Sequence, residues 1–403
     1  MSPQIFKTSE GIFQTQLQRI QLEKAKSTFV IGIPKEIYED ENRIALVPHS
    51  IHKLVAMGHQ VIVEASAGER SNFTDLDFTE AGAEVSNNKE QVFQSDIIIK
   101  VIPPTLDEIA LFRSNQVLIS PLQMPLINNE YLQALRHKRV TAIAMEYLKS
   151  EDGSYPLVRI MSEIAGLAVI HTAAELLCNG AGGRGVLLGG ISGVPPAKVL
   201  ILGAGAVAEF ATRAALALGA SVRIFDDEIH KLIRIQNAIG RQLYTSSLDP
   251  VPLLRQLISA DVVIGAIHSK DGRTPMVVTE EMVAKMKQGS VVIDVSIDQG
   301  GCFETSQVTT HDKPIRIIHG VIHYAVPNIA SKVSRTASSG MSNIISTLLK
   351  KAGEVGGIEQ LLYSNKGFQN GIYTYRGCLT NKYLSERFGI KYTNLELLLT
   401  TGF

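Results

Sequence analysis

The chain has 403 residues, 45% of them hydrophobic and 19% charged, which is enough for two or three domains with sizeable cores. Its 39 Lys and Arg residues balance 39 Asp and Glu residues, which argues against a nucleic-acid protein or a polybasic membrane binder, because both need a basic face. Three isolated cysteines indicate neither a zinc site nor a disulfide framework, and with no signal-peptide core or long apolar run we expect a cytoplasmic protein.

The first part of the chain predicts an arm followed by an α/β domain. Residues 1–28 are polar and are expected to lie outside the core, either as a poorly ordered terminus or packed on a partner subunit. From Phe29 onward, short β-branched runs alternate with helical patterns. The predicted strands cover 29–33, 61–64, 97–102, 117–120 and 141–145, and a helix covers 49–57. This alternation indicates a parallel sheet and a first domain over 29–156.

A second α/β series follows. It opens with a predicted helix over 160–178 and a loop that holds seven glycines between Gly180 and Gly193. Strands are predicted at 198–202, 221–225, 261–266 and 290–295, which gives a second domain over 157–334. Residues 335–403 are predicted to be helical, with a long helix over 338–352 that returns to the first domain. The expected fold class is therefore α/β, with a doubly wound Rossmann-type domain and a discontinuous α/β domain.

The strongest motif follows the strand over 198–202. Gly203 and Gly205 precede Ala206, Val207 and Ala208, which open an Ala-rich helix. The first glycine permits a tight turn, the second lets the backbone approach a pyrophosphate, and the small Ala208 lets the helix meet the strand. The amides of the helix N-terminus then face the phosphates. In this strand–turn–helix context the motif predicts a dinucleotide site rather than an empty glycine turn.

The next strand ends at Asp226, 23 residues after Gly203. A carboxylate there accepts hydrogen bonds from the adenosine ribose and repels a 2′-phosphate, which predicts NAD rather than NADP. The acidic residues that follow, Asp227 and Glu228, are expected to be a solvated loop.

Two further residues are candidates for binding a substrate. Asp298 follows the strand over 290–295, at the strand end where ligands of open α/β sheets bind, and is expected to polarise a substrate or position an amine. The alternative is a turn aspartate that caps the next segment. Arg43 follows the first strand and is a candidate clamp for a carboxylate; the alternative is a surface arginine paired with Glu39 or Asp40.

Together these motifs resemble the alanine dehydrogenase / transhydrogenase α-subunit family, and the likeness spans nearly the whole chain from residue 29. Besides the dinucleotide turn, the matching segments are Gly32-Ile-Pro-Lys-Glu, Gly58-His59, Ala67-Gly68-Glu69, Met161-Ser-Glu-Ile-Ala-Gly, Gly182-Gly-Arg-Gly-Val-Leu-Leu-Gly-Gly, Asp298-Gln-Gly-Gly-Cys-Phe-Glu and Val326-Pro-Asn-Ile.

The resemblance implies an NAD-dependent oxidoreductase that interconverts L-alanine with pyruvate and ammonium, takes small amino and 2-oxo acids, uses no metal, and forms a homo-oligomer, either a hexamer or a dimer. It implies that Arg43 binds the substrate carboxylate and that Asp298 is the active-site aspartate. It further implies that four residues line the NAD pocket: Ser162, Ile267, Val295 and Asn328.

Two positions depart from the family pattern. Ile102 stands where relatives have a substrate-binding lysine, although Lys100 is kept, and Gln123 stands where they have an active-site histidine. Glutamine cannot exchange a proton near neutral pH, so His268 and His323 are candidate substitutes. The departures imply weakened or altered turnover. They leave open a catalytically impaired NAD(H)-binding paralogue, or a soluble transhydrogenase-like nucleotide subunit.

Overall fold

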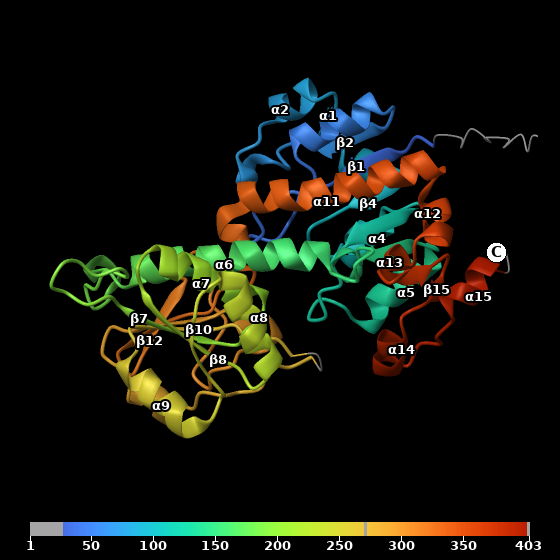
Figure 1. Ribbon diagram of the computed structural model, residues 1–403. Coiled ribbons are helices and arrows are strands. Elements are labelled where there is room, and N and C mark those ends of the chain that lie inside the picture. Colours follow the sequence, from blue (N-terminus) through green and yellow to red (C-terminus); the bar gives the residue numbers. More distant parts are fainter. Residues whose placement is uncertain (1–26, 270–271, 401–403) are drawn as a thin grey trace, which may run out of the picture.

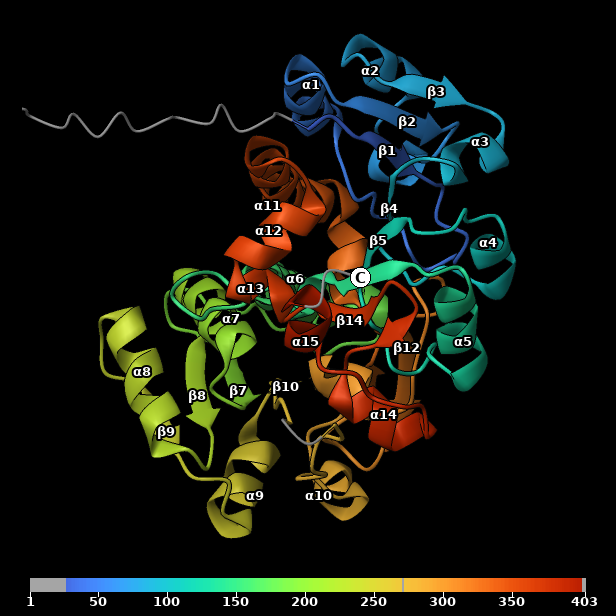
Figure 2. The same ribbon diagram turned by 90° about the vertical axis from the view of Figure 1, so that its right-hand side faces the viewer.

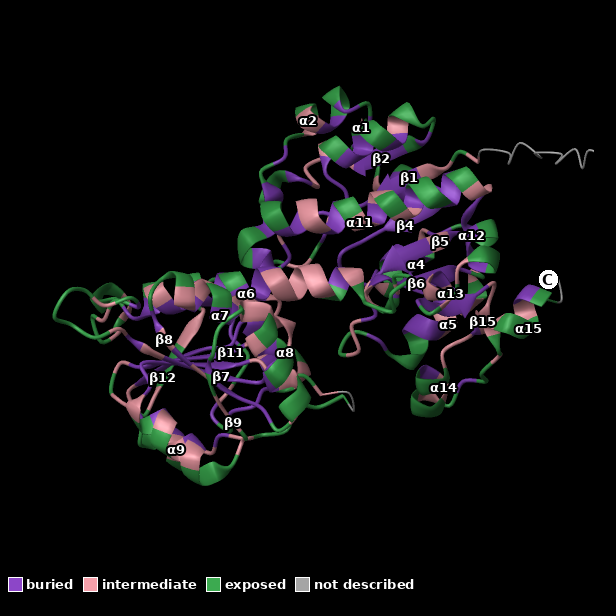
Figure 3. Cartoon of the chain, in the orientation of Figure 1, coloured by how far each residue is buried: buried purple, intermediate pink, exposed green. Residues whose placement is uncertain are grey.

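The computed structural model describes residues 27–269 and 272–400, so the predicted arm lies almost wholly outside the described residues. The described chain forms two sheets, each with its own covering of helices (Figures 1 and 2). Both sheets are buried between helices whose outer faces are exposed (Figure 3).

The first sheet has eight strands in the order β15-β14-β6-β5-β4-β1-β2-β3. Its strands are β1 Val30–Ile33, β2 Gln60–Glu64, β3 Glu84–Ser86, β4 Ile97–Ile99, β5 Val117–Ser120, β6 Thr141–Ala144, β14 Ile372–Tyr375 and β15 Cys378–Leu379. Strands β1 to β6 pair in parallel, whereas β14 is antiparallel to β6 and β15. The α-helices around this sheet are α1 Pro48–Ala56, α2 Asp75–Glu80, α3 Lys89–Phe93, α4 Leu106–Ala110, α5 Asn129–His137, α12 Ile358–Ser364, α13 Lys366–Gln369, α14 Lys382–Phe388 and α15 Leu395–Thr400.

The second sheet has seven strands in the order β12-β13-β11-β10-β7-β8-β9, of which only β12 runs antiparallel to its neighbour. Its strands are β7 Lys198–Leu202, β8 Ser221–Phe225, β9 Tyr244–Ser246, β10 Val262–Gly265, β11 Val291–Asp294, β12 Ile315–Ile318 and β13 Val321–Tyr324. Its α-helices are α7 Ala206–Ala217, α8 Ile229–Ile239, α9 Pro250–Ser259 and α10 Glu280–Ala284. Short 3-10 turns at η1 Glu69–Ser71, η2 Met145–Tyr147, η3 Asn179–Ala181, η4 Val295–Gln299 and η5 Ile329–Val333 complete the described elements.

The two sheets have the same strand order. Numbered along the chain, six strands of each sheet stand in the order 3-2-1-4-5-6: β3-β2-β1-β4-β5-β6 in the first, and β9-β8-β7-β10-β11-β13 in the second. The order reverses between β1 and β4 and again between β7 and β10. In such sheets the loops at the carboxyl ends of these strands part and leave room for a ligand. The expected doubly wound α/β class is confirmed.

Two long helices, α6 Pro156–Leu176 and α11 Ser334–Val355, carry the chain from one sheet to the other and back (Figure 1). Gly166 of α6 packs so closely on α7 that a Cβ would lie 2.5 Å from the Val207 carbonyl oxygen. Among the described residues, α6 alone is long and apolar enough to cross a membrane, and half of its most apolar window is buried in the protein.

The structure corrects several predicted bounds. The helix predicted over 160–178 begins earlier, at Pro156, because proline suits the first turn, where its missing amide is not needed. The helix predicted over 338–352 is α11, which is longer at both ends. The helical prediction after residue 335 is wrong at β14 and β15, because the short Ile-Tyr-Thr-Tyr run becomes a strand by pairing with β6.

Candidate functional site

The turn between β7 and α7 has the backbone that a dinucleotide needs. Gly203 has a φ of +101°, and a Cβ there would lie 2.4 Å from the carbonyl oxygen of Ala266. Gly205 is the N-cap of α7, and a Cβ built on it meets nothing within 4 Å. No side chain caps α7, so the amides of Ala206, Val207 and Ala208 in its first turn remain available to an anion. This open, uncapped helix end fits a pyrophosphate.

Asp226 lies beside this turn, at the end of β8, and is 8% exposed. Its Oδ2 accepts a hydrogen bond from the Ala204 amide at 2.7 Å, and its Oδ1 accepts one from the Glu228 amide at 2.8 Å. These bonds fix the carboxylate next to the turn, and each oxygen keeps a lone pair for a ribose hydroxyl.

Two of the other predicted residues, Ile267 and Val295, follow strands of the same sheet, and a third, Ser162, lies on α6. Ile267 follows β10, and its amide donates to Ser296 Oγ at 3.0 Å, which ties the ends of β10 and β11 together. Val295 directly follows β11. Ser162 belongs to α6, next to Met161, whose sulfur contacts the Arg43 guanidinium. The Met161 contact therefore joins this part of α6 to the loop after β1.

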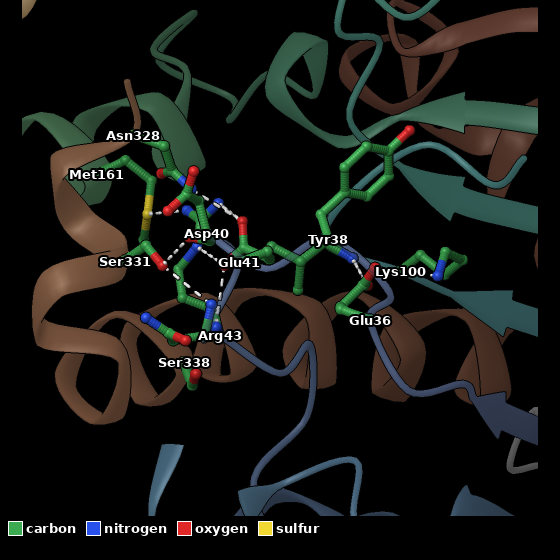
Figure 4. A network of polar contacts seen from close by, with 12 residues as sticks. Glu36, Tyr38, Asp40, Glu41, Arg43, Lys100, Met161, Asn328, Ser331 and Ser338 are labelled. Carbon is green, nitrogen blue, oxygen red and sulfur yellow. Dashed lines mark hydrogen bonds and ion pairs between the residues drawn. The ribbon is translucent and has the colours of Figure 1, made fainter. Parts of the chain in front are cut away.

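Arg43 is buried and bound along one edge by Glu41 (Figure 4). Arg43 Nε donates to Glu41 Oε1 at 2.7 Å, and Arg43 Nη2 donates to Glu41 Oε2 at 2.6 Å. Burial works against the charged guanidinium, but Glu41, together with the charges of Glu36 and Asp298, more than offsets this and raises the pKa of Arg43. Since Glu41 takes the Nε edge, the edge formed by Nη1 and Nη2 is left for other ligands. Among the described residues, the one hydrogen-bond partner of Nη1 is the Met161 sulfur at 3.4 Å. The arginine pairs with Glu41, not with Glu39 or Asp40.

Asn328 joins this ion pair to Asp298. Its side-chain amide donates to Glu41 Oε2 at 2.8 Å, and its backbone amide donates to Asp298 Oδ1 at 3.2 Å. Asn328 has a φ of +56°, a conformation that asparagine tolerates better than most residues. Solvent reaches Asp298, yet the protein packed around it raises the pKa of this carboxyl, while the Asn328 bond and the Arg43 charge lower it. Arg43 and Asp298 therefore act on one another from the two sheets.

Lys100 forms a second, fully buried network where β4 ends (Figure 4). Its ammonium lies 2.9 Å from Glu36 and 3.4 Å from Glu108. Burial opposes the charge on Lys100, but the two carboxylates raise the pKa of the lysine, so it stays protonated. Glu36 also accepts a hydrogen bond from the Val101 amide at 2.6 Å, which fixes the start of the loop that carries Arg43.

Comparison with known proteins places this architecture. Family models match residues 32–165 as "Alanine dehydrogenase/PNT, N-terminal domain" and residues 168–382 as "Alanine dehydrogenase/PNT, C-terminal domain". The chain belongs to the alanine dehydrogenase/PNT family. It is 41% identical to Alanine dehydrogenase 2 of Staphylococcus aureus (strain USA300) over 369 residues, which cover 91% of this chain and 98% of that protein.

Solved structures agree with this alanine dehydrogenase/PNT assignment. An L-alanine dehydrogenase matches with a TM-score of 0.83 and 34% identity, covering 89% of this chain and 98% of that one. A transhydrogenase from Sinorhizobium meliloti matches with a TM-score of 0.74 and 25% identity, covering 88% and 99% of the two chains.

The two positions that depart from the family pattern lie at neighbouring strand ends of this alanine dehydrogenase/PNT chain. Ile102 follows β4 and is 7% exposed, and Gln123 follows β5 and is half-buried. Neither side chain brings a charge to that edge. Of the two histidines considered as substitutes, His323 is buried, with Nδ1 donating to the Val321 carbonyl and Nε2 accepting from Thr305 Oγ1 at 2.8 Å. Burial also lowers the pKa of His323, so it is a neutral structural residue.

His268 follows β10 and is exposed, so it is the histidine of the pair that solvent reaches.

Sequence reasoning missed two acidic residues near the site of this alanine dehydrogenase/PNT chain. Glu41 stands two positions before Arg43, and that short spacing was the available signal. Glu146 follows β6, and its Oε1 accepts a hydrogen bond from the Leu122 amide at 2.6 Å. No sequence pattern distinguishes its buried carboxyl from a surface glutamate.

Proposed function

We propose that this chain is an NAD-dependent alanine dehydrogenase, which interconverts L-alanine with pyruvate and ammonium. The observation that carries the proposal is the pairing of a buried, Glu41-held Arg43 with Asp298 through Asn328. An arginine edge beside an acidic group suits a substrate that has a carboxylate and an amine one carbon apart. The alanine dehydrogenases among the relatives support the choice of alanine.

In this proposal the nicotinamide cofactor supplies the hydride chemistry, and the protein supplies binding and orientation. The amides of Ala206, Val207 and Ala208 hold the pyrophosphate. Arg43 binds the substrate carboxylate through its Nη1 and Nη2 edge. Asp298 orients the amine, or the water that adds to the imine, and holds a proton more readily than a free aspartate in water because the surrounding protein raises its pKa.

The cofactor pocket is completed by residues from both strands and helices. We propose that Gly203 and Gly205 line the pyrophosphate and that Asp226 binds the adenosine ribose. The remaining members of the pocket are Ser162, Ile267, Val295 and Asn328.

A second candidate function is NAD(H) binding with little turnover. Ile102 and Gln123 favour it, since neither residue can carry a proton or a positive charge to the substrate oxygen. The two candidates predict the same cofactor affinity and different turnover.

One experiment separates the candidates. The purified full chain is mixed with NADH, ammonium and pyruvate, and NADH oxidation is compared with that for a panel of other 2-oxo acids. We expect pyruvate to be reduced, and Arg43→Ala to abolish that reaction without changing NADH affinity. Tight NADH binding with no oxidation on any acid of the panel would support the second candidate instead.

The choice of NAD is tested at Asp226. The wild-type chain is expected to bind NADH much more tightly than NADPH, because the Asp226 carboxylate repels a 2′-phosphate. Asp226→Ala is expected to weaken NADH binding and to reduce the difference between the two cofactors. Titration by cofactor fluorescence measures both affinities. Equal binding of the two cofactors by the wild-type chain would rule out the assignment.

We further propose a homo-oligomer that works in the cytoplasm. The glycine-rich loop after α6 carries the exposed apolar side chains Leu187, Ile191 and Val194, which are 65%, 64% and 54% exposed. Exposed apolar clusters of this kind favour contact with another protein surface. Light scattering coupled to size exclusion measures the mass, and a monomer would contradict the proposal.

A further inference from the structure

A row of serine hydroxyls faces the loop that carries Arg43. Ser331 lies in η5, just after Asn328, and Ser338 and Ser342 lie one turn apart on α11. All three side chains are at most 1% exposed. Residues four apart on a helix share one face, so Ser338 and Ser342 present their hydroxyls to the same side (Figure 4 shows Ser331 and Ser338).

Each serine of this row accepts a hydrogen bond from one backbone amide of the loop between β1 and α1. The bonds are Asn42 N to Ser331 Oγ at 2.9 Å, Ile44 N to Ser338 Oγ at 2.9 Å, and Val47 N to Ser342 Oγ at 3.0 Å. Two of these amides flank Arg43 directly. A buried amide that loses its acceptor costs about 1–3 kcal/mol, so the loop depends on these hydroxyls for its conformation.

The hydroxyls of Ser331 and Ser338 make further hydrogen bonds. Ser331 Oγ donates to the Asp40 carbonyl at 2.7 Å. Ser338 Oγ lies 3.1 Å from Ser71 Oγ, and Ser71 donates to the Asn42 carbonyl at 2.6 Å. The loop between β1 and α1 belongs to no strand or helix. Its backbone amides on both sides of Arg43 therefore find their hydrogen-bond partners in side chains from other parts of the chain.

We propose that Ser331, Ser338 and Ser342 are positioning residues that fix Arg43 for binding the substrate carboxylate. The inference rests on the proposed role of Arg43 in substrate binding. Because the row begins three residues after Asn328, one continuous segment holds both Arg43, through the serines, and Asp298, through the Asn328 amide. This segment therefore contacts both of the groups that the proposed function places at the substrate.

The chain offers a matched control for the test. Ser338→Ala removes the acceptor of the Ile44 amide. Ser339→Ala changes the next residue of the same helix, whose hydroxyl only returns to the Arg335 carbonyl at 2.9 Å. For both variants and the wild type, we would measure KM and kcat with pyruvate and ammonium, pyruvate binding to the NADH complex by fluorescence, and NADH affinity.

Ser338→Ala is expected to raise the KM and the dissociation constant for pyruvate by about 5- to 150-fold, which corresponds to the cost of one buried amide left unpaired. NADH affinity is expected to stay unchanged, and Ser339→Ala is expected to match the wild type. Unchanged pyruvate binding in Ser338→Ala would overturn the proposal, as would an equal loss of NADH affinity in a folded Ser338→Ala protein, because the effect would then not be specific to the substrate.

Two further measurements separate this inference from the proposed function. If Ser338→Ala does not fold, Ser342→Ala tests the same row at Val47, and wild-type pyruvate binding there would overturn the proposal. If the wild type binds pyruvate but turns over no substrate, the proposed function fails, while the binding comparison still decides the role of the row. A wild type whose NADH complex binds no pyruvate overturns both.

Discussion

Glu41 decides how Arg43 meets a ligand. Its carboxylate accepts from the amide, Nε and Nη2 of Arg43 and from the Asn328 side chain, which uses both oxygens twice. Glu41→Gln removes the negative charge and leaves one oxygen for these donors. We expect KM for alanine and for pyruvate to rise about 10-fold or more, because a hydrogen bond to a charged group is worth about 1.5–3 kcal/mol.

Glu39→Gln serves as the control for that change, since Glu39 is an exposed acid in the same loop. Steady-state kinetics together with NADH titration would check the prediction. The same KM in both variants would show that Glu41 does not hold Arg43 in its binding position.

Glu146 makes stability depend on pH. Its Oε2 is buried without a hydrogen-bond partner among the described residues, and burial raises the pKa of this carboxyl to about 7. The folded state then holds a proton that the unfolded state releases near pH 4.5, so stability falls as pH rises between these values. The loss amounts to about 3 kcal/mol at 1.36 kcal/mol per pKa unit.

Glu146→Gln is expected to remove this loss, because the amide stays neutral throughout. Melting temperatures at pH 5 and pH 8 would measure it, with the exposed Glu90→Gln as a control that should behave as the wild type does. If the difference in melting temperature between the two pH values is the same with and without Glu146, another group is responsible.

Among the elements, we expect the residues after β4 and β5 to control turnover. Here Ile102 and Gln123 stand where the family resemblance implies a lysine and a histidine. The double change Ile102→Lys with Gln123→His is expected to raise kcat/KM for alanine, since a positioned acid or base contributes about 10²- to 10⁴-fold. Steady-state kinetics on both single variants and the double variant would show whether the effects add. No gain in any of the three would mean that these strand ends do not face the substrate.

Elements with a strong local pattern were predictable from the sequence. The alternation of apolar strands and helices gave the doubly wound class, and the glycine turn before α7 was located because its strand, turn and helix are contiguous. Strands β14 and β15 were not predictable, since their four- and two-residue runs become strands only through pairing in the sheet. The same holds for the serine row, whose role depends on contacts between residues 289 to 295 positions apart in the chain.

For the whole molecule, the domain bounds stay a prediction that fragments can test. We expect residues 157–334 alone to fold and to bind NADH, because the dinucleotide turn and its sheet lie within them. We expect residues 29–156 alone not to fold, since their core lacks Met341, Ile345 and Leu349 of α11. Circular dichroism and NADH titration would check both fragments. A folded 29–156 fragment would contradict the assignment of the C-terminal segment to that domain.

The two crossings of the chain limit how the halves of the molecule can move. Helices α6 and α11 are both covalent links between the sheets, and they touch where a Cβ on Gly340 would lie 2.8 Å from Ile160. A single linker would let one half rotate in any direction relative to the other. Two linkers in contact leave essentially one motion, a rotation about the axis on which both helices lie. We therefore expect the two halves to open and close by a hinge rotation about α6 and α11, which would change the distance between Arg43 and Asp298.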